Sequence, residues 1–186
     1  MRKLVVLLAA CGPKAGTAIQ NERGGTGMTI GESGVGVIDA KTHVTLASMR
    51  ALFPDYEVAP EASASSTIFN VMNKGEKLLY VVANDDGSVF GVHVTSGSIG
   101  NSTHAWRVGG TLGAGVIDSC DCWGTPGDEV TTCFKAGEHV AVVFELQCSG
   151  HYTTPQERQQ LAGAKISRVV WQPKPWQPTP RSEEGM

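Results

Sequence analysis

The sequence contains no long hydrophobic run and no excess of basic residues. The apolar run near its N-terminus, Leu4–Ala10, is only seven residues long, and no later segment approaches the about 20 apolar residues that a membrane-spanning helix requires. Lysine and arginine total 15 against 18 aspartates and glutamates, for a formal net charge of −3. Nucleic-acid affinity comes largely from clustered basic residues that neutralise phosphates. We therefore expect a domain that neither crosses a membrane nor binds nucleic acid.

Motifs of catalysis, metal binding and phosphate binding are also absent from the sequence. Neither H-x-x-H nor H-E-x-x-H occurs, the spacings that place two imidazoles on one helical face. The glycine-rich stretches 31–36 and 109–115 lack the order of a phosphate loop, and no G-x-S-x-G elbow is present. We therefore predict no catalytic residue, no metal, no cofactor and no enzymatic activity. The histidines considered are His43, His93, His104, His139 and His151.

The N-terminus has the pattern of a secretion signal. The cationic start Met1-Arg2-Lys3 is followed by the apolar run and then by Cys11. Leu8-Ala9-Ala10-Cys11 resembles the lipobox of bacterial lipoproteins, which implies cleavage before Cys11 and acylation of its sulfur and new amino group by palmitate or a similar chain. Several acyl chains together anchor a protein durably in a membrane. The alternative is a buried N-terminal strand with an incidental cysteine.

The residue after Cys11 indicates which membrane would hold this anchor. In lipoproteins of enteric bacteria an aspartate at this position retains the protein in the inner membrane, and here the position is Gly12. By this analogy we predict attachment to the outer membrane, with the domain facing the periplasm. The expected partners are the membrane itself and another envelope protein.

Four cysteines follow the lipidation site, and an even number in an exported chain favours disulfide bonds. Cys120 and Cys122 are two positions apart, so on a strand their side chains share one face about 7 Å apart and do not bond to each other. Two pairings remain, 120–133 with 122–148 or 120–148 with 122–133. A four-thiolate zinc site is the alternative, but structural zinc usually takes paired C-x₂₋₄-C knuckles. The candidate disulfide residues are Cys120, Cys122, Cys133 and Cys148.

The composition divides the chain into four regions. Residues 1–10 form the predicted signal peptide, and residues 11–30, rich in Gly and Thr, form a flexible spacer. Residues 31–172 form a single globular domain, because the chain is too short for two well-buried cores. Residues 173–186 form an extended, proline-rich tail.

The first half of the domain predicts a strand, a helix and a β-meander. A short strand over Val35–Asp39 precedes a helix over residues 46–53, which Thr45 caps. Three strands joined by two Asn- and Gly-containing turns follow. On the third strand, Val92 and Val94 are expected to share a face with Phe90. The strands are Thr67–Met72, Lys77–Ala83 and Ser88–Thr95.

The second half predicts paired strands over Thr131–Lys135 and His139–Leu146, a helix from Thr154 to Gly163 and a final strand over Lys165–Trp171. Gly36-Val37-Ile38-Asp39 recurs as Gly115-Val116-Ile117-Asp118, which suggests two degenerate repeats. The predicted fold class is therefore α+β, with a mainly antiparallel sheet and two short helices.

Several segments of the domain, taken in order, resemble the sigma-E (RpoE)-regulated lipoprotein family of the YfeY type. They are Gly34-Val35-Gly36, the meander around Phe69-Asn70-Val71-Met72 and Asp86-Gly87-Ser88-Val89, and the closing Lys165–Trp171. A lipid-bearing cysteine and a later cysteine pair also match, whereas two further cysteines and the proline-rich tail depart from the pattern. The resemblance implies an envelope-stress-linked, membrane-anchored protein, and it supplies no catalytic residues because the family has no known biochemical function.

Two tryptophans are candidate contact residues for a partner protein. Trp123 follows Cys122, and an exposed tryptophan there or at Trp106 would be a natural anchor; packing in the core or over a disulfide is the alternative. The lipid anchor and the missing catalytic set favour a membrane-anchored, non-enzymatic interaction domain of the bacterial cell envelope. A small-ligand-binding periplasmic lipoprotein and an unrecognised hydrolase are the alternatives.

Overall fold

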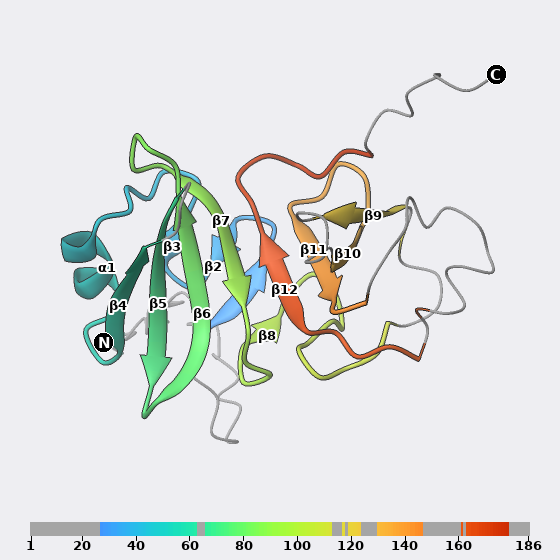
Figure 1. Ribbon diagram of the computed structural model, residues 1–186, viewed down its shortest axis with the longest axis horizontal. Helices are drawn as coiled ribbons and strands as arrows, with labels where there is room; N and C mark the ends of the chain where they lie inside the picture. Colours follow the sequence, from blue (N-terminus) through green and yellow to red (C-terminus); the bar gives the residue numbers. More distant parts are fainter. Residues whose placement is uncertain are drawn as a thin grey trace, which may run out of the picture.

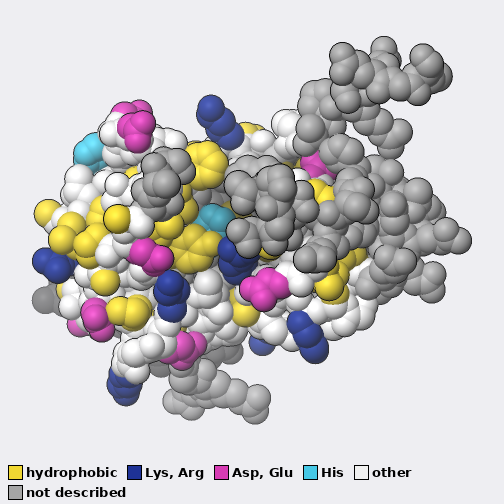
Figure 2. Space-filling view, in the orientation of Figure 1, with side chains coloured by type: hydrophobic (Ala, Val, Ile, Leu, Met, Phe, Trp, Pro, Cys, Tyr) yellow, Lys and Arg dark blue, Asp and Glu magenta, His cyan; other side chains and the backbone are white. Residues whose placement is uncertain are grey.

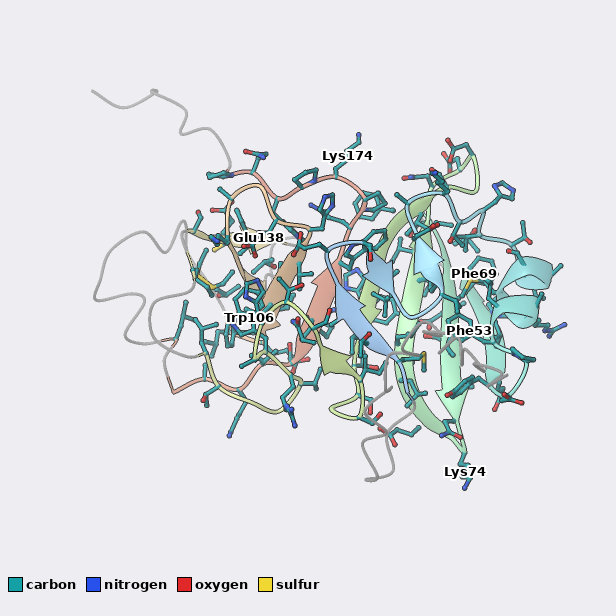
Figure 3. The ribbon with its side chains drawn as sticks, turned by 180° about the vertical axis from the view of Figure 1, so that it is seen from behind. Phe53, Phe69, Lys74, Trp106, Glu138 and Lys174 are labelled. Carbon is teal, nitrogen blue, oxygen red and sulfur yellow. A yellow bond between two sulfur atoms is a disulfide. The ribbon has the colours of Figure 1, made fainter. Side chains whose placement is uncertain are left out.

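The computed structural model describes residues 27–62, 66–112, 117, 119–123, 130–146, 161 and 163–178. These residues form an eight-stranded sheet and a four-stranded sheet (Figure 1). The smaller sheet lies behind the larger one in Figure 1 and in front of it in Figure 3, so the two sheets form layers. The predicted class, an α+β fold dominated by antiparallel sheet, is confirmed.

The large sheet is antiparallel throughout and joins the two halves of the chain. Its central seam pairs β7 with β12, and Val94 stands opposite Val169 there. In spatial order the strands are β4 (Glu57–Ala62), β5 (Thr67–Asn73), β6 (Glu76–Ala83), β7 (Val89–Val94), β12 (Arg168–Trp171), β11 (Val140–Phe144), β10 (Val130–Phe134) and β9 (Ser119–Trp123).

The predicted meander is confirmed as β5, β6 and β7. In its first turn Lys74 has φ 50° and Gly75 has φ 84°. Two successive positive φ values are what a two-residue hairpin turn needs to match the twist of its strands. The predicted pairing of strands on either side of Gly137 is likewise confirmed by β10 and β11.

The predicted face of Phe90 is wrong because β7 contains an irregularity. Val82 pairs with Gly91, but the next residue, Ala83, pairs with Val89, so Phe90 is an extra residue. A bulge of this kind reverses the alternation of faces beyond it. Val89 therefore joins Val92 in the core, while Phe90 is 42% exposed.

The small sheet consists of very short strands that the sequence did not reveal. Where a single strand was predicted over Val35–Asp39, the chain instead makes a tight hairpin, with Gly36 at φ 57° in the turn. At Gly34 an added Cβ would lie 2.0 Å from the carbonyl oxygen of Ile38, so this close approach requires glycine. In spatial order the strands are β3 (Ile38–Asp39), β2 (Gly34–Val35), β1 (Thr29–Gly31) and β8 (Gly100–Asn101).

The helix predicted after Thr45 is confirmed as α1 (Leu46–Leu52). The Thr45 hydroxyl accepts a hydrogen bond from the Ser48 amide at 3.1 Å, and the Ser48 hydroxyl accepts one from the Thr45 amide at 2.9 Å. This reciprocal arrangement satisfies two backbone donors that a helix start leaves unpaired. Met49 and Phe53 are buried, so α1 packs its apolar face onto the core beside β4.

The main core fills the space between the two sheets, and we call the face of the large sheet that lines it the inner face. Ile30 and Val35 from the small sheet contribute to this core together with Leu79 and Val92 from the large one. The opposite, outer face carries a smaller apolar cluster, to which Trp176 belongs. In the described part of the chain, no helix is long and apolar enough to cross a membrane.

Two of the predicted boundaries shift. The folded unit includes Thr29 and Ile30, which pair in β1, although both were assigned to the spacer. It also extends past residue 172, because Trp176 is 7% exposed and packs on the outer face. The second predicted helix, the second copy of the proposed repeat, and the signal peptide lie largely or wholly outside the described residues.

Candidate functional site

A pocket of about 60 Å³ opens on the outer face of the large sheet, across the seam between β7 and β12. Its walls are mainly apolar, and two of its residues, His93 and Arg168, bring ring nitrogens and a guanidinium to it. Figure 2 shows this face, on which hydrophobic side chains gather over β5–β7 around a histidine. The lining residues are Phe90, Gly91, His93, Val130, Thr132, Val143, Arg168, Val170, Gln172 and Trp176.

Two polar side chains of this pocket, His93 and Arg168, both contact Tyr80 on the neighbouring part of the sheet. The rings of Tyr80 and His93 stack with centroids 4.4 Å apart and planes 7° from parallel. Arg168 donates from Nη1 to the Tyr80 hydroxyl at 2.9 Å. The three residues stand on adjacent strands, β6, β7 and β12, so the sheet register fixes their relative positions.

Two nitrogen atoms of this group are buried and have no hydrogen-bond partner in the described structure: Nε of Arg168 and Nδ1 of His93. No carboxylate of the described residues lies within ion-pair distance of Arg168. A buried polar atom without a partner is uncommon, and a guanidinium without a counter-charge still more so. Within the described part of the chain, the positive charge of Arg168 at this pocket therefore has no matching carboxylate.

His93 is held neutral by its surroundings. Burial of the ring, and next the charge of Arg168, lower the pKa of His93 from 6.5 to about 3. At neutral pH the ring therefore presents one N–H donor and one nitrogen acceptor, and it adds no charge to that of Arg168.

The C-terminal segment forms one wall of the pocket. The rings of Phe134 and Trp176 stack with centroids 5.3 Å apart. The backbone N–H of Trp176 donates a hydrogen bond to the Glu138 carbonyl at 2.8 Å, and the Trp176 carbonyl accepts a hydrogen bond from the Gly137 N–H at 2.9 Å. The hairpin turn between β10 and β11 thus holds the segment on the outer face.

A second polar cluster lies where the two sheets meet, and we call it the junction cluster: Glu32, His104 and Glu138. His104 Nε2 and Glu138 Oε2 are 2.5 Å apart, and Lys135 donates to Glu138 Oε1 at 2.9 Å. The His104 ring stacks on buried Trp106 with centroids 3.8 Å apart. Figure 3 shows Glu138 and Trp106 at this end of the molecule, far from Phe53 and Phe69.

The junction cluster fastens one sheet to the other. Partial burial opposes ionisation of Glu138, but hydrogen bonds from Lys135 and His104 outweigh it and hold the pKa of Glu138 below its usual value. Glu32 accepts the backbone N–H of His139 at 2.9 Å, and its carbonyl accepts from the Trp171 indole at 3.0 Å. Both carboxylates of the junction cluster, Glu32 and Glu138, therefore accept a hydrogen bond from another group of the protein.

The junction cluster is also the one group of described residues that could hold a divalent cation. One oxygen or nitrogen from each of its three residues lies within 4.8 Å of the others, and carboxylate and imidazole ligands suit several divalent metals. The side-chain partner of His104 among the described residues is the carboxylate of Glu138. Sequence reasoning missed the cluster because its members are 34 or more residues apart.

Cys120 and Cys133 form a disulfide on the inner face, and both are fully buried. They stand opposite each other on β9 and β10, with Cα atoms 4.0 Å apart. This bond belongs to the first of the two pairings considered. Cys122 is also disulfide-bonded, and Cys148, like Cys11, lies outside the described residues.

The two tryptophans proposed as partner contacts have different positions. Trp106 is 3% exposed and belongs to the main core, so it packs beneath His104 and offers no surface anchor. Trp123 ends β9, and its side chain lies outside the described part.

A larger hollow of about 340 Å³ lies beside the small sheet, but it is polar. Its lining includes Thr29, Ser33, Asp39 and Ser102. Pockets for small organic ligands are usually apolar and have volumes of about 300–1,000 Å³. Neither this hollow nor the outer-face pocket combines that size with an apolar lining.

The fold is similar to that of a solved bacterial protein. The crystal structure of the uncharacterized protein yfeY from Escherichia coli superposes with a TM-score of 0.57 and 18% sequence identity, covering 77% of this chain and 99% of that one. The chain thus has a YfeY-like fold. No protein-family model matches the chain, and no curated protein matches it.

Proposed function

We propose that this chain is a lipid-anchored, non-enzymatic interaction domain of the bacterial cell envelope, related to the sigma-E-regulated lipoproteins. The observation that carries the proposal is the outer-face pocket. There an apolar wall and the exposed ring of Phe90 surround a guanidinium that has no acidic partner among the described residues.

This composition is typical of a recognition surface. Aromatic residues and arginine are enriched at the centres of protein interfaces and supply most of their hot spots. Phe90 owes its exposure to the bulge in β7, which turns it away from the core. Bulges often redirect a side chain toward a functional surface.

The disulfide supports a location in the envelope. Structural disulfides persist in oxidising compartments such as the periplasm and are rare in the cytosol. The Cys120–Cys133 bond is fully buried in the core, so it is part of the folded structure. This agrees with the secretion signal and lipobox before Cys11.

Intact-mass analysis of the protein extracted from bacterial membranes tests the anchor. The proposal expects a chain that begins at Cys11, carries acyl groups and contains no free thiol. A Cys11→Ser variant should lose the acyl mass and leave the membrane fraction. A wild-type chain recovered from the cytosol with residues 1–10 intact would contradict the proposed location.

Site-specific photocrosslinking in cells tests the interaction surface. A photoreactive residue replaces Phe90 in one strain and Val37 in another; Val37 is 58% exposed and stands in the hairpin turn of the small sheet. The proposal expects a discrete crosslinked band from position 90 and none from position 37. Equal crosslinking from both positions, or none from either, would argue against an interaction site on the outer face.

A further inference from the structure

We infer that the outer-face pocket binds a carboxylate on a short aliphatic stem, presented as a glutamate or aspartate side chain by a partner protein. The inference rests on the proposed function and names the chemistry of the same site. It follows from the charge, the size and the hydrogen-bonding capacity of the pocket.

The positive charge of Arg168 favours an anion as the ligand of this pocket. Arg168 is partly buried, and its one described side-chain partner is the neutral Tyr80 hydroxyl. Guanidinium–carboxylate pairs are among the strongest hydrogen-bonded pairs, because two parallel N–H donors match two oxygens. Nη1 donates to Tyr80 and Nε is shielded from solvent, so an incoming carboxylate would meet the guanidinium at Nη2, for which the described residues offer no acceptor.

The size of the pocket limits the ligand to a side chain. Its volume of about 60 Å³ is well below the roughly 300 Å³ at which pockets for small organic ligands begin. The apolar walls from Val143 and Val170 suit methylene groups. A carboxylate with one or two methylenes meets both conditions.

The histidine helps to discriminate between ligands. Because His93 remains neutral, it can donate one hydrogen bond to a carboxylate without adding a second positive charge. An ammonium group would be repelled by Arg168, and an alcohol would leave the guanidinium without a counter-charge. The pocket should therefore prefer a carboxylate to an alcohol or an amine of the same length.

Titration of the purified full-length protein with butanoate tests this inference, since butanoate has the chain of a glutamate side chain with a methyl group at the Cα position. The readouts are the NMR shifts of the Arg168 Nε–H and the Gly91 amide. Butanoate should bind at least about tenfold more tightly than 1-butanol or butylammonium. Arg168→Met should remove that preference, whereas Lys165→Met, at an exposed lysine three residues earlier, should leave it unchanged.

The possible results separate the alternatives. Equal binding of butanoate and 1-butanol by the wild type overturns the inference, and this comparison decides even if Arg168→Met does not fold. Decanoate binding more than about 100-fold tighter than butanoate would identify a free fatty acid as the ligand and overturn the role of a partner side chain. A preference for butanoate without crosslinking at position 90 overturns the proposed function alone; crosslinking without the preference overturns this inference alone.

Discussion

The indole of Trp171 donates a hydrogen bond from Nε1 to the carbonyl oxygen of Glu32 at 3.0 Å, across 139 positions of sequence. Trp171 ends β12 in the large sheet, and Glu32 lies in the turn between β1 and β2 of the small sheet. The Trp171 side chain is 1% exposed, so the bond is shielded from water. This contact is one of those that hold the two layers together.

Trp171→Phe should lower the free energy of unfolding by about 1 kcal/mol, because it removes the hydrogen bond to the Glu32 carbonyl while keeping an aromatic ring in the core. Trp171→Ala should cost more, about 3–5 kcal/mol, because it also opens a cavity. Urea denaturation measures both variants. A Trp171→Phe variant as stable as the wild type would contradict a contribution from the hydrogen bond, and equal stabilities for the two variants would contradict the cost of the cavity.

Stability should fall in acid through His93. Its pKa is about 3 in the folded protein and 6.5 when unperturbed, so the unfolded chain takes up a proton first as the pH decreases. The contribution of the neutral ring is therefore complete above pH 6.5 and is lost at about 1.4 kcal/mol per pH unit below it. His93→Phe retains the stacking on Tyr80 but removes this titration.

The measurement for His93 is the difference in unfolding free energy between wild type and His93→Phe from pH 7 to pH 5. The wild type should lose stability relative to the variant as the pH falls. A constant difference over this range would show that the folded and unfolded forms bind protons alike at this site.

Removal of the Cys120–Cys133 disulfide should destabilise the domain by about 3 kcal/mol, the chain-entropy value for a loop of roughly this length. The two cysteines are 13 positions apart. Thermal denaturation of the Cys120→Ala/Cys133→Ala double variant gives the value. Both side chains are fully buried, so their replacement also removes packed atoms from the core. A double variant as stable as the wild type would therefore mean that the bond is not formed in the native protein.

Thr45→Ala should cost about 1 kcal/mol, because the backbone N–H of Ser48 loses its side-chain acceptor at the start of α1. Thr45→Ser keeps a hydroxyl at the same position and should be close to wild type. Chemical denaturation of both variants makes the comparison. An equal loss in both would assign the effect to the threonine methyl group rather than to the cap.

The sequence predicted the features that depend on neighbouring residues. The turns around Gly75 and Gly137, the cap at Thr45 and the alternating strands of the meander follow from backbone geometry over two to four positions. Strand β4 was missed because Pro60 interrupts its pattern; proline is tolerated there because β4 is an edge strand. The irregularity at Phe90 was missed because it depends on the register against β6.

The sequence by itself therefore determined the local elements, the secretion pattern before Cys11 and the even set of later cysteines. Only the tertiary structure decided which distant segments meet. It paired β7 with β12, placed Arg168 beside His93 and Tyr80, and brought Glu32 to His104 and Glu138. Such contacts depend on strand order and register, which maximise burial over the whole sheet and leave no short-range spacing in the sequence.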